Sequence, residues 1–190
     1  RSQGNPFFMN ELLREHLLNP RNQGSSLPDT IRETVRRHVE LADRQTQAVL
    51  SAAAAVGRSF ALWELSELGL DLSKASLLDH IRSAQETAII GPGRRTNEYQ
   101  FTHILFQEYL ARQIPQLEKA QYHKRLAEAI TSKHGLGRGP HILSTFRHLS
   151  ELALTESVED YPAVTFEAAT YSLEIHALEE TLVILDTGLA

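Results

Sequence analysis

The sequence contains no cysteine, and it has only one methionine and one tryptophan among 190 residues. Without cysteine, the chain has neither disulfide bonds nor thiolate nucleophiles, and zinc could be bound only by histidine and carboxylates. Glycine supplies 10 residues and proline 7, too few for a collagenous or low-complexity chain. These absences leave a globular protein, and we expect it in the reducing environment of the cytoplasm.

Basic residues are also scarce. Lys and Arg number 19 against 24 Asp and Glu, which gives a net charge of -5. This is the wrong sign for a protein that binds a phosphate backbone through bulk charge. No run approaches the roughly 20 apolar residues that cross a bilayer, and the start lacks the layout of a signal peptide. We therefore expect neither a nucleic acid nor a membrane as direct partner.

Both ends of the sequence look like cuts within a longer chain. It begins at Arg1 without a methionine and stops at Ala190 within a helical pattern. We therefore expect a piece of a longer protein, whose function would be the function of a part.

Apolar spacing predicts a mostly helical fold, and only two short runs predict strands. The first amphipathic helix is expected over 6–18, and the linker that follows contains two helix breakers. A second helix is expected to open at Pro28 and Asp29. A domain boundary is therefore predicted near residue 25.

Three helices and a hairpin are predicted next. The helices cover 46–56, 61–68 and 73–86, and Ser73 is the expected N-cap of the last one. The runs 88–90 and 98–101 then predict two strands joined by a turn rich in glycine. Three helices followed by a hairpin is the order of a winged helix.

The rest of the chain predicts antiparallel helical hairpins. Asp160 is a possible cap for one of these helices, and the last two would suit the first hairpin of a tetratricopeptide-like array with an exposed stacking face. The expected helices are 103–113, 115–134, 142–154, 162–175 and 177–189. The predicted parts of the chain are the end of a lid with a linker (1–25), a winged helix (26–114), and a helical linker with the start of repeats (115–190).

Motifs that carry chemistry are missing. No Gly-Lys dipeptide occurs in the sequence, so the chain has no phosphate-binding loop and we expect no enzyme activity from this piece. No Gly-x-Ser-x-Gly elbow is present either. His141 and His148 have the best spacing for a metal pair, but we interpret them as partly exposed helix histidines and expect no metal site.

A winged helix raises the question of DNA binding. The third predicted helix, 73–86, carries Lys74 and Arg82 against Asp79 and Glu86. Its charges sum to zero, whereas helices that read the major groove present basic and amide side chains. Sequence-specific DNA binding is therefore the less favoured alternative.

Four segments in a fixed order resemble one family. They are similar to the region downstream of the ATPase core in STAND-type signalling ATPases, such as large ATP-binding transcription regulators of the LuxR or antibiotic-regulatory type and related cyclases. The resemblance covers nearly the whole chain. The segments are GNPFFMNELL (4–13), LPDTIRETV (27–35), AAAAVGRSF (52–60) and YQFTHILFQEYL (99–110).

The resemblance implies a switch that is gated by ADP and ATP, with Mg in the parent protein. It places Gly4 and Pro6 beside the nucleotide base and His103 on the β-phosphate of bound ADP. A histidine at a strand-to-helix junction can donate to phosphate, and the helix N-terminus adds favourable partial charge. Alternatively, Pro6 is a simple N1 proline and His103 a capping or core residue. Ile104 stands where plant relatives often have Asp, so bracing of His103 by a carboxylate is not expected.

The function implied by the resemblance is regulation. The fragment would couple the nucleotide state of an upstream core of the same chain to protein or small-molecule ligands of the helical repeats, in transcription regulation. The rival is a protein-interaction scaffold whose helical tail binds a partner without any nucleotide contact.

Overall fold

The computed structural model describes residues 29–136 and 139–189. The chain divides into two compact units, one ending at Ile114 and the other beginning at Pro115. Both units are mostly helical, which confirms the predicted fold class at that level. Gly4, Pro6 and the helix predicted over 6–18 lie outside the described residues.

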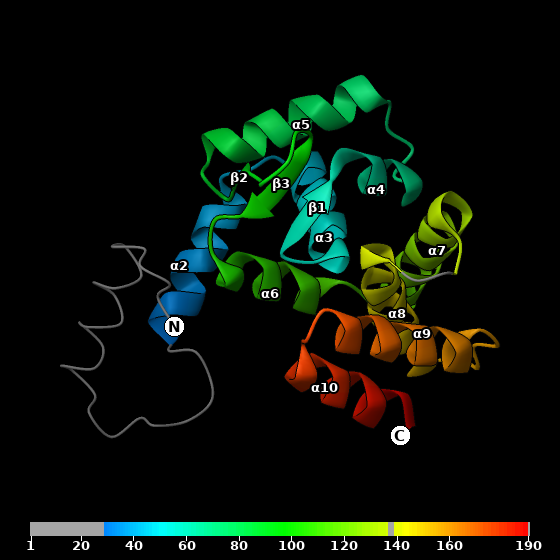
Figure 1. The fold of residues 1–190 in the computed structure, drawn as a ribbon. Helices are drawn as coiled ribbons and strands as arrows, with labels where there is room; N and C mark the ends of the chain where they lie inside the picture. Colours follow the sequence, from blue (N-terminus) through cyan, green and yellow to red (C-terminus); the bar gives the residue numbers. More distant parts are fainter. Residues whose placement is uncertain (1–28, 137–138, 190) are drawn as a thin grey trace, which may run out of the picture. The chain divides into compact units, whose positions relative to one another are not determined.

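The first unit combines helices with a small antiparallel sheet (Figure 1). The strands lie in the order β1-β3-β2, so the last strand in the chain is the central one. Phe60 pairs with Tyr99, and Gly91 pairs with Gln100. The elements are α2 (Asp29–Glu40), α3 (Arg44–Val56), β1 (Ser59–Ala61), α4 (Leu62–Glu67), α5 (Lys74–Glu86), β2 (Ile90–Pro92), β3 (Glu98–Phe101) and α6 (Ile104–Gln113).

Two strand predictions need correction. The sequence predicts two strands, whereas this sheet has a third, β1, between α3 and α4. The predicted strand over 88–90 begins only at Ile90, because Ala88 belongs to the turn that ends α5. Ala88 has a φ of 54°, and the Ile89 amide donates to the Ala84 carbonyl at 3.1 Å. This is a Schellman motif with alanine in the left-handed position that usually holds glycine.

Local capping fixes where the helices of the first unit begin and end. Asp43 Oδ1 accepts hydrogen bonds from the amides of Gln45 and Thr46, both at 2.9 Å. Ser73 caps α5 by accepting from the Ser76 amide at 3.1 Å, as predicted. Gly57 ends α3 with a φ of 140°, a backbone conformation that favours glycine. These polar contacts satisfy amides that would otherwise lack partners at the helix ends.

The core of the first unit lies between the helices and the sheet. Helix α3, whose alanines are buried, packs against α5 and α6, and Gln107 of α6 donates to the Ala54 carbonyl at 2.9 Å. His38 of α2 lies 2.7 Å from the Thr87 carbonyl, which ties α2 to the end of α5. The largest fully buried side chains of this unit are Phe60, Phe101, Leu50, Leu65, Leu68, Leu77, Ile81, Ile89 and Ile90.

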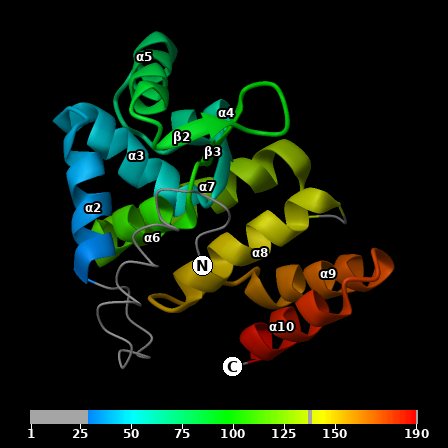
Figure 2. The same ribbon diagram turned by 90° about the vertical axis from the view of Figure 1, so that its left-hand side faces the viewer.

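The second unit is a stack of helices in which each packs against the next (Figure 2). Buried apolar residues of α8 and α9 form its main core, to which α10 adds Ile184. The helices are α7 (Gln116–His134), α8 (Pro140–Ala153), α9 (Tyr161–Glu174) and α10 (Leu178–Leu189).

The ends of α9 and α10 rest on tertiary contacts. Asp160 occupies the N-cap position of α9, as predicted, but its side chain makes no capping hydrogen bond. A Cβ atom at Gly188 would collide with the Thr165 side chain. Glycine therefore permits the close approach of α10 to α9. Among the helices in the described ranges, none combines the length and apolarity needed to cross a membrane.

Candidate functional site

His103 stands at the junction between β3 and α6. It is the N-cap of α6, with extended backbone, and its Nδ1 accepts a hydrogen bond from the Leu105 amide at 3.2 Å. The Phe106 amide donates to the His103 carbonyl at 3.2 Å. The side chain is fully buried. The capping interpretation of His103 is thus confirmed, whereas its contact with phosphate stays a prediction.

The geometry limits how His103 could meet a phosphate. Because Nδ1 accepts from the Leu105 amide, a neutral His103 ring carries its proton on Nε2. Only Nε2 could then donate to a phosphate oxygen. Since the ring is fully buried, such a contact requires neighbouring residues to move. Gly4 and Pro6, the other predicted nucleotide contacts, lie outside the described residues.

A second histidine arrangement lies in the second unit, between α7 and α8. His123 Nδ1 and His148 Nδ1 are 2.9 Å apart, and the two rings tilt by 36° with centroids 5.2 Å apart. His123 is 4% exposed and His148 is fully buried. A hydrogen bond between two ring nitrogens requires that one carries a proton and the other does not.

The groups around the histidine pair indicate which ring nitrogens carry a proton. Arg147 Nη2, which can only donate, lies 3.4 Å from His148 Nε2 and so favours a lone pair there. His148 then carries its proton on Nδ1 and donates it to His123 Nδ1. His123 in turn carries its proton on Nε2, which lies 4.0 Å from Glu151 Oε2. Buried His123 Nε2 has no hydrogen-bond partner at a shorter distance.

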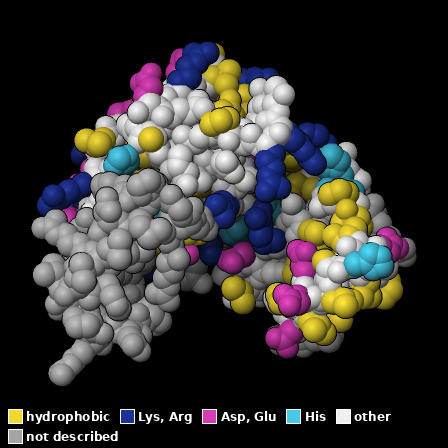
Figure 3. All heavy atoms as spheres, turned by 60° about the vertical axis from the view of Figure 1, so that its left-hand side comes forward, with side chains coloured by type: hydrophobic (Ala, Val, Ile, Leu, Met, Phe, Trp, Pro, Cys, Tyr) yellow, Lys and Arg dark blue, Asp and Glu magenta, His cyan; other side chains and the backbone are white. Residues whose placement is uncertain are grey.

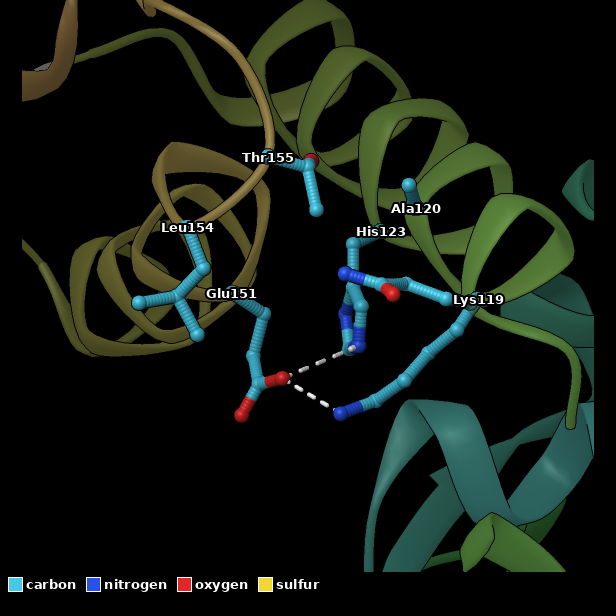
Figure 4. A pocket seen from close by; sticks show the side chains of 7 residues that line it. Lys119, Ala120, His123, Glu151, Leu154 and Thr155 are labelled. Atoms are coloured by element: carbon cyan, nitrogen blue, oxygen red, sulfur yellow. Dashed lines mark hydrogen bonds and ion pairs between the residues drawn. The ribbon is translucent and has the colours of Figure 1, made fainter. Parts of the chain in front are cut away.

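Glu151 connects the histidine pair to a small pocket in the second unit (Figure 4). Its carboxylate points toward both His123 and Lys119, and the Lys119 ammonium lies 2.5 Å from Oε2. The pocket has a cavity volume of about 80 Å³, enough for a few water molecules. Its lining residues are Gln116, Lys119, Ala120, His123, Glu151, Leu154 and Thr155.

Burial keeps both histidines neutral. Loss of solvation lowers the pKa of His123 to about 4, while Glu151 acts in the opposite direction and Lys119 and Arg147 lower the pKa further. Burial, Arg147 and the neighbouring ring hold the pKa of His148 well below its usual value. At neutral pH the pair therefore joins α7 to α8 by a hydrogen bond between uncharged rings. Protonation of either ring would place a charge in the core.

His141 and His148, the two histidines with the best spacing for a metal pair, face different partners in the structure. His141 stacks on His134, with ring centroids 5.0 Å apart, while His148 bonds to His123. His148 is also fully buried, not partly exposed as the sequence suggested, because its face of α8 packs against α7. Within the described ranges, no group of three or more His, Cys, Asp or Glu residues could hold a metal ion.

Sequence reasoning missed His123. One signal was present, since His123, Ala127 and Ile130 recur at intervals of four and three residues on the buried stripe of α7. That spacing predicts burial, but it does not identify the partner on another helix 25 residues later.

The described residues thus offer a capping histidine in the first unit and a neutral histidine pair beside a small pocket in the second. Neither arrangement includes an activated nucleophile or a metal centre that would define an enzyme class. No protein-family model, no curated protein and no solved structure matches the chain.

Proposed function

We propose that this chain is a regulatory part of a nucleotide-switched signalling ATPase of the STAND type. In this proposal the first unit is a winged helix that closes over an upstream nucleotide-binding core, and the second unit begins a helical repeat array that senses a ligand. The observation that carries the proposal is the place of His103, two residues after the end of β3 and at the N-cap of α6.

The order of elements in the first unit supports the winged helix. From α3 to β3 the order is helix, strand, helix, helix and hairpin, and β1 pairs with the second strand of the hairpin. In a winged helix the first strand lies between the first two helices and completes the sheet of the wing. The third strand, β1, which the sequence did not predict, strengthens this interpretation.

His103 would act as the sensor of the resting state. In the proposed closed state its Nε2–H donates to a phosphate oxygen of ADP, while Nδ1 keeps its bond to the Leu105 amide. A ligand shifts a conformational equilibrium only by its difference in affinity for the two states. ADP must therefore contact His103 in the closed state, and ATP with Mg must favour a state in which this contact is lost.

DNA binding by the same unit finds less support. Helix α5, in the position of a recognition helix, balances two basic residues with two acidic ones. Arg82 Nη1 lies 2.9 Å from Asp79 Oδ1 on the same helix. A helix of zero net charge with an intrahelical ion pair is a poor match for a phosphate backbone.

The test is the affinity for ADP and ATP of a longer chain that includes the nucleotide-binding core, measured by calorimetry with His103→Asn. Asparagine is a good N-cap, so this variant keeps the cap of α6 and removes the Nε2 donor. We expect about a tenfold or greater loss of ADP affinity, since a hydrogen bond to a charged group contributes about 1.5 to 3 kcal/mol. ATP affinity should change much less.

Ser73→Asn is the matched control, because it exchanges the N-cap of another helix in the same unit. It should leave both affinities unchanged. Equal ADP affinity of His103→Asn and the unaltered chain would overturn the proposed sensor and leave His103 as a capping residue.

A further inference from the structure

Large apolar side chains are exposed along the last two helices. Leu182 is 68% exposed and Phe166 is 65% exposed, although both belong to well-formed helices. Grouped apolar exposure of this kind marks interaction surfaces more often than scattered single residues do. The exposed residues are Phe166, Leu173, Ile175, Leu178, Leu182, Val183 and Leu185.

Three leucines form one stripe along α10. Leu178, Leu182 and Leu185 are separated by four and three residues, which places them on the same face of a helix. The buried residues Thr181 and Ile184 occupy a different face. Ile184 packs into the core that α8 and α9 share. The leucine stripe therefore points away from that core.

Helix α9 presents apolar residues on the same side. Val164 and Ala168 pack into the core shared with α8, and Thr165, one step round the helix, meets Gly188 of α10. Phe166 and Leu173 lie seven residues apart and further round in the same direction. Phe166, Leu173, Leu178, Leu182 and Leu185 together make one surface across α9 and α10, named here the leucine face.

The charge around the leucine face is of one sign. From Glu156 to Ala190 the sequence has eight acidic residues and neither lysine nor arginine. Glu179 and Asp186, both exposed, flank the leucine stripe on the side away from α9. Figure 3 shows acidic and hydrophobic side chains close together at the lower right, where these helices lie.

We propose that the leucine face binds an amphipathic helix of a partner protein, with apolar anchors along one stripe and lysine or arginine beside it. Leucines at intervals of four and three residues form a ridge that packs against the groove of another helix. Basic flanks would meet Glu179 and Asp186. A second copy of this chain fits less well, because it would bring acidic rims together. A further repeat of the proposed array would cover the same face, so this inference is an alternative to that stacking and does not rest on the proposed function.

The test uses the 190-residue chain and two fluorescent synthetic helices. Both peptides carry the same leucine stripe, one with lysine flanks and the other with glutamate flanks. We expect the lysine peptide to bind and the glutamate peptide to bind at least about tenfold more weakly, with the difference shrinking as salt is raised. Equal binding of the two peptides, or no binding of either, would overturn the proposal.

Two variants on one helix locate the binding surface. Leu182→Gln removes an anchor of the leucine face and should weaken binding of the lysine peptide by about tenfold. Val183→Gln is the matched control, since Val183 is also exposed (63%) but lies off the stripe. Equal effects of the two variants would overturn the assignment to this face.

Two further measurements complete the test: the peptide preference of a charge-reversed variant, and the oligomeric state of the chain by sedimentation. The double variant Glu179→Lys with Asp186→Lys should prefer the glutamate peptide. If the chain alone forms a dimer that Leu182→Gln dissociates, the occupant is a second copy and the proposal is wrong. None of these results depends on nucleotide, so failure here and failure of the proposed sensor are separable.

Discussion

The two units of the chain bury their apolar residues in different ways. In the first, helices and a sheet enclose the core, and among the described side chains Leu41 is its one large apolar residue that is strongly exposed. In the second, helices follow one another in a stack, and the last two expose the leucine face. Helices packed around a small sheet cover the apolar residues of the first unit, whereas each helix of a stack contacts only its neighbours and the last helices keep an apolar face exposed.

The polar side chains at helix ends and between helices also differ between the two units. In the first unit, Asp43, Ser73 and His103 bond to backbone amides of the helices they begin. In the second, His123 and His148 bond to each other across two helices, and Asp160 makes no capping bond. Helix ends in the first unit are therefore set by local sequence, while the second unit relies on contacts between helices.

The largest expected effect is a loss of stability that is confined to the first unit. Phe60→Ala removes a ring that is 1% exposed in the first core and should lower its free energy of unfolding by about 3 to 5 kcal/mol. Trp63, the single tryptophan, lies in this unit, so its fluorescence reports the transition. Hydrogen exchange of Ile142 in α8 should stay unchanged, and equal loss of protection there would mean that the units unfold together.

Acid should weaken the second unit more than the first. His123 takes up a proton near pH 6.5 when unfolded but only near pH 4 when folded. The contribution of neutral His123 to the free energy of unfolding is therefore complete above pH 6.5 and is lost as the pH falls. At pH 5 the loss amounts to about 2 kcal/mol. Hydrogen exchange of Leu126 in α7 at several pH values measures this loss.

A double variant checks the origin of that pH dependence. His123→Leu with His148→Leu removes both rings, and apolar replacement of a buried hydrogen-bonded pair can be nearly neutral. The variant should keep the fold at neutral pH and lose most of the acid sensitivity of α7 and α8. Unchanged acid sensitivity would assign it to other groups.

A smaller effect compares two aspartates at helix starts. Asp43→Ala should lower the free energy of unfolding by about 1 kcal/mol, because Asp43 caps α3 with two backbone hydrogen bonds. Asp160→Ala should change stability by less than about 0.5 kcal/mol, since its side chain makes no capping bond. Urea denaturation of both variants gives the two values, and similar costs would contradict the difference in capping.

The smallest expected effect concerns the leucine face. Leu182→Gln should change the free energy of unfolding by less than about 0.5 kcal/mol, because the side chain is already 68% exposed. Thermal unfolding followed by circular dichroism measures the change. A large loss of stability would show that Leu182 supports the fold and would remove the basis for treating it as a binding residue.

Local signals predicted much of the first unit. The strand Glu98–Phe101, the N-cap Ser73 and the helix end at Gly57 were confirmed, since each depends on residues close in sequence. The three-residue strand β1 was missed because its partner β3 lies about forty positions away in the chain and so short a run has no measurable period. Ala88 was assigned to a strand because the sequence around it does not reveal a left-handed alanine.

In the second unit, helices were predicted better than their contacts. Leu173, Leu178, Leu182 and Leu185 are exposed, and both the repeat array and its stacking face stay predictions. The histidine pair was missed because helical periodicity identifies a buried face but not the residue that it meets. The phosphate contact of His103 depends on residues outside the described ranges and stays a prediction.

Gly188 has a consequence for selectivity. Its missing methyl group lets the end of α10 approach Thr165 of α9, while the short connection at Ala177 holds the two helices together at their other end. A larger residue at 188 would push α9 and α10 apart at one end, so the leucine face would become wider at that end than at the other. The size of the side chains that a partner helix can insert is thus governed by a residue that has no side chain of its own.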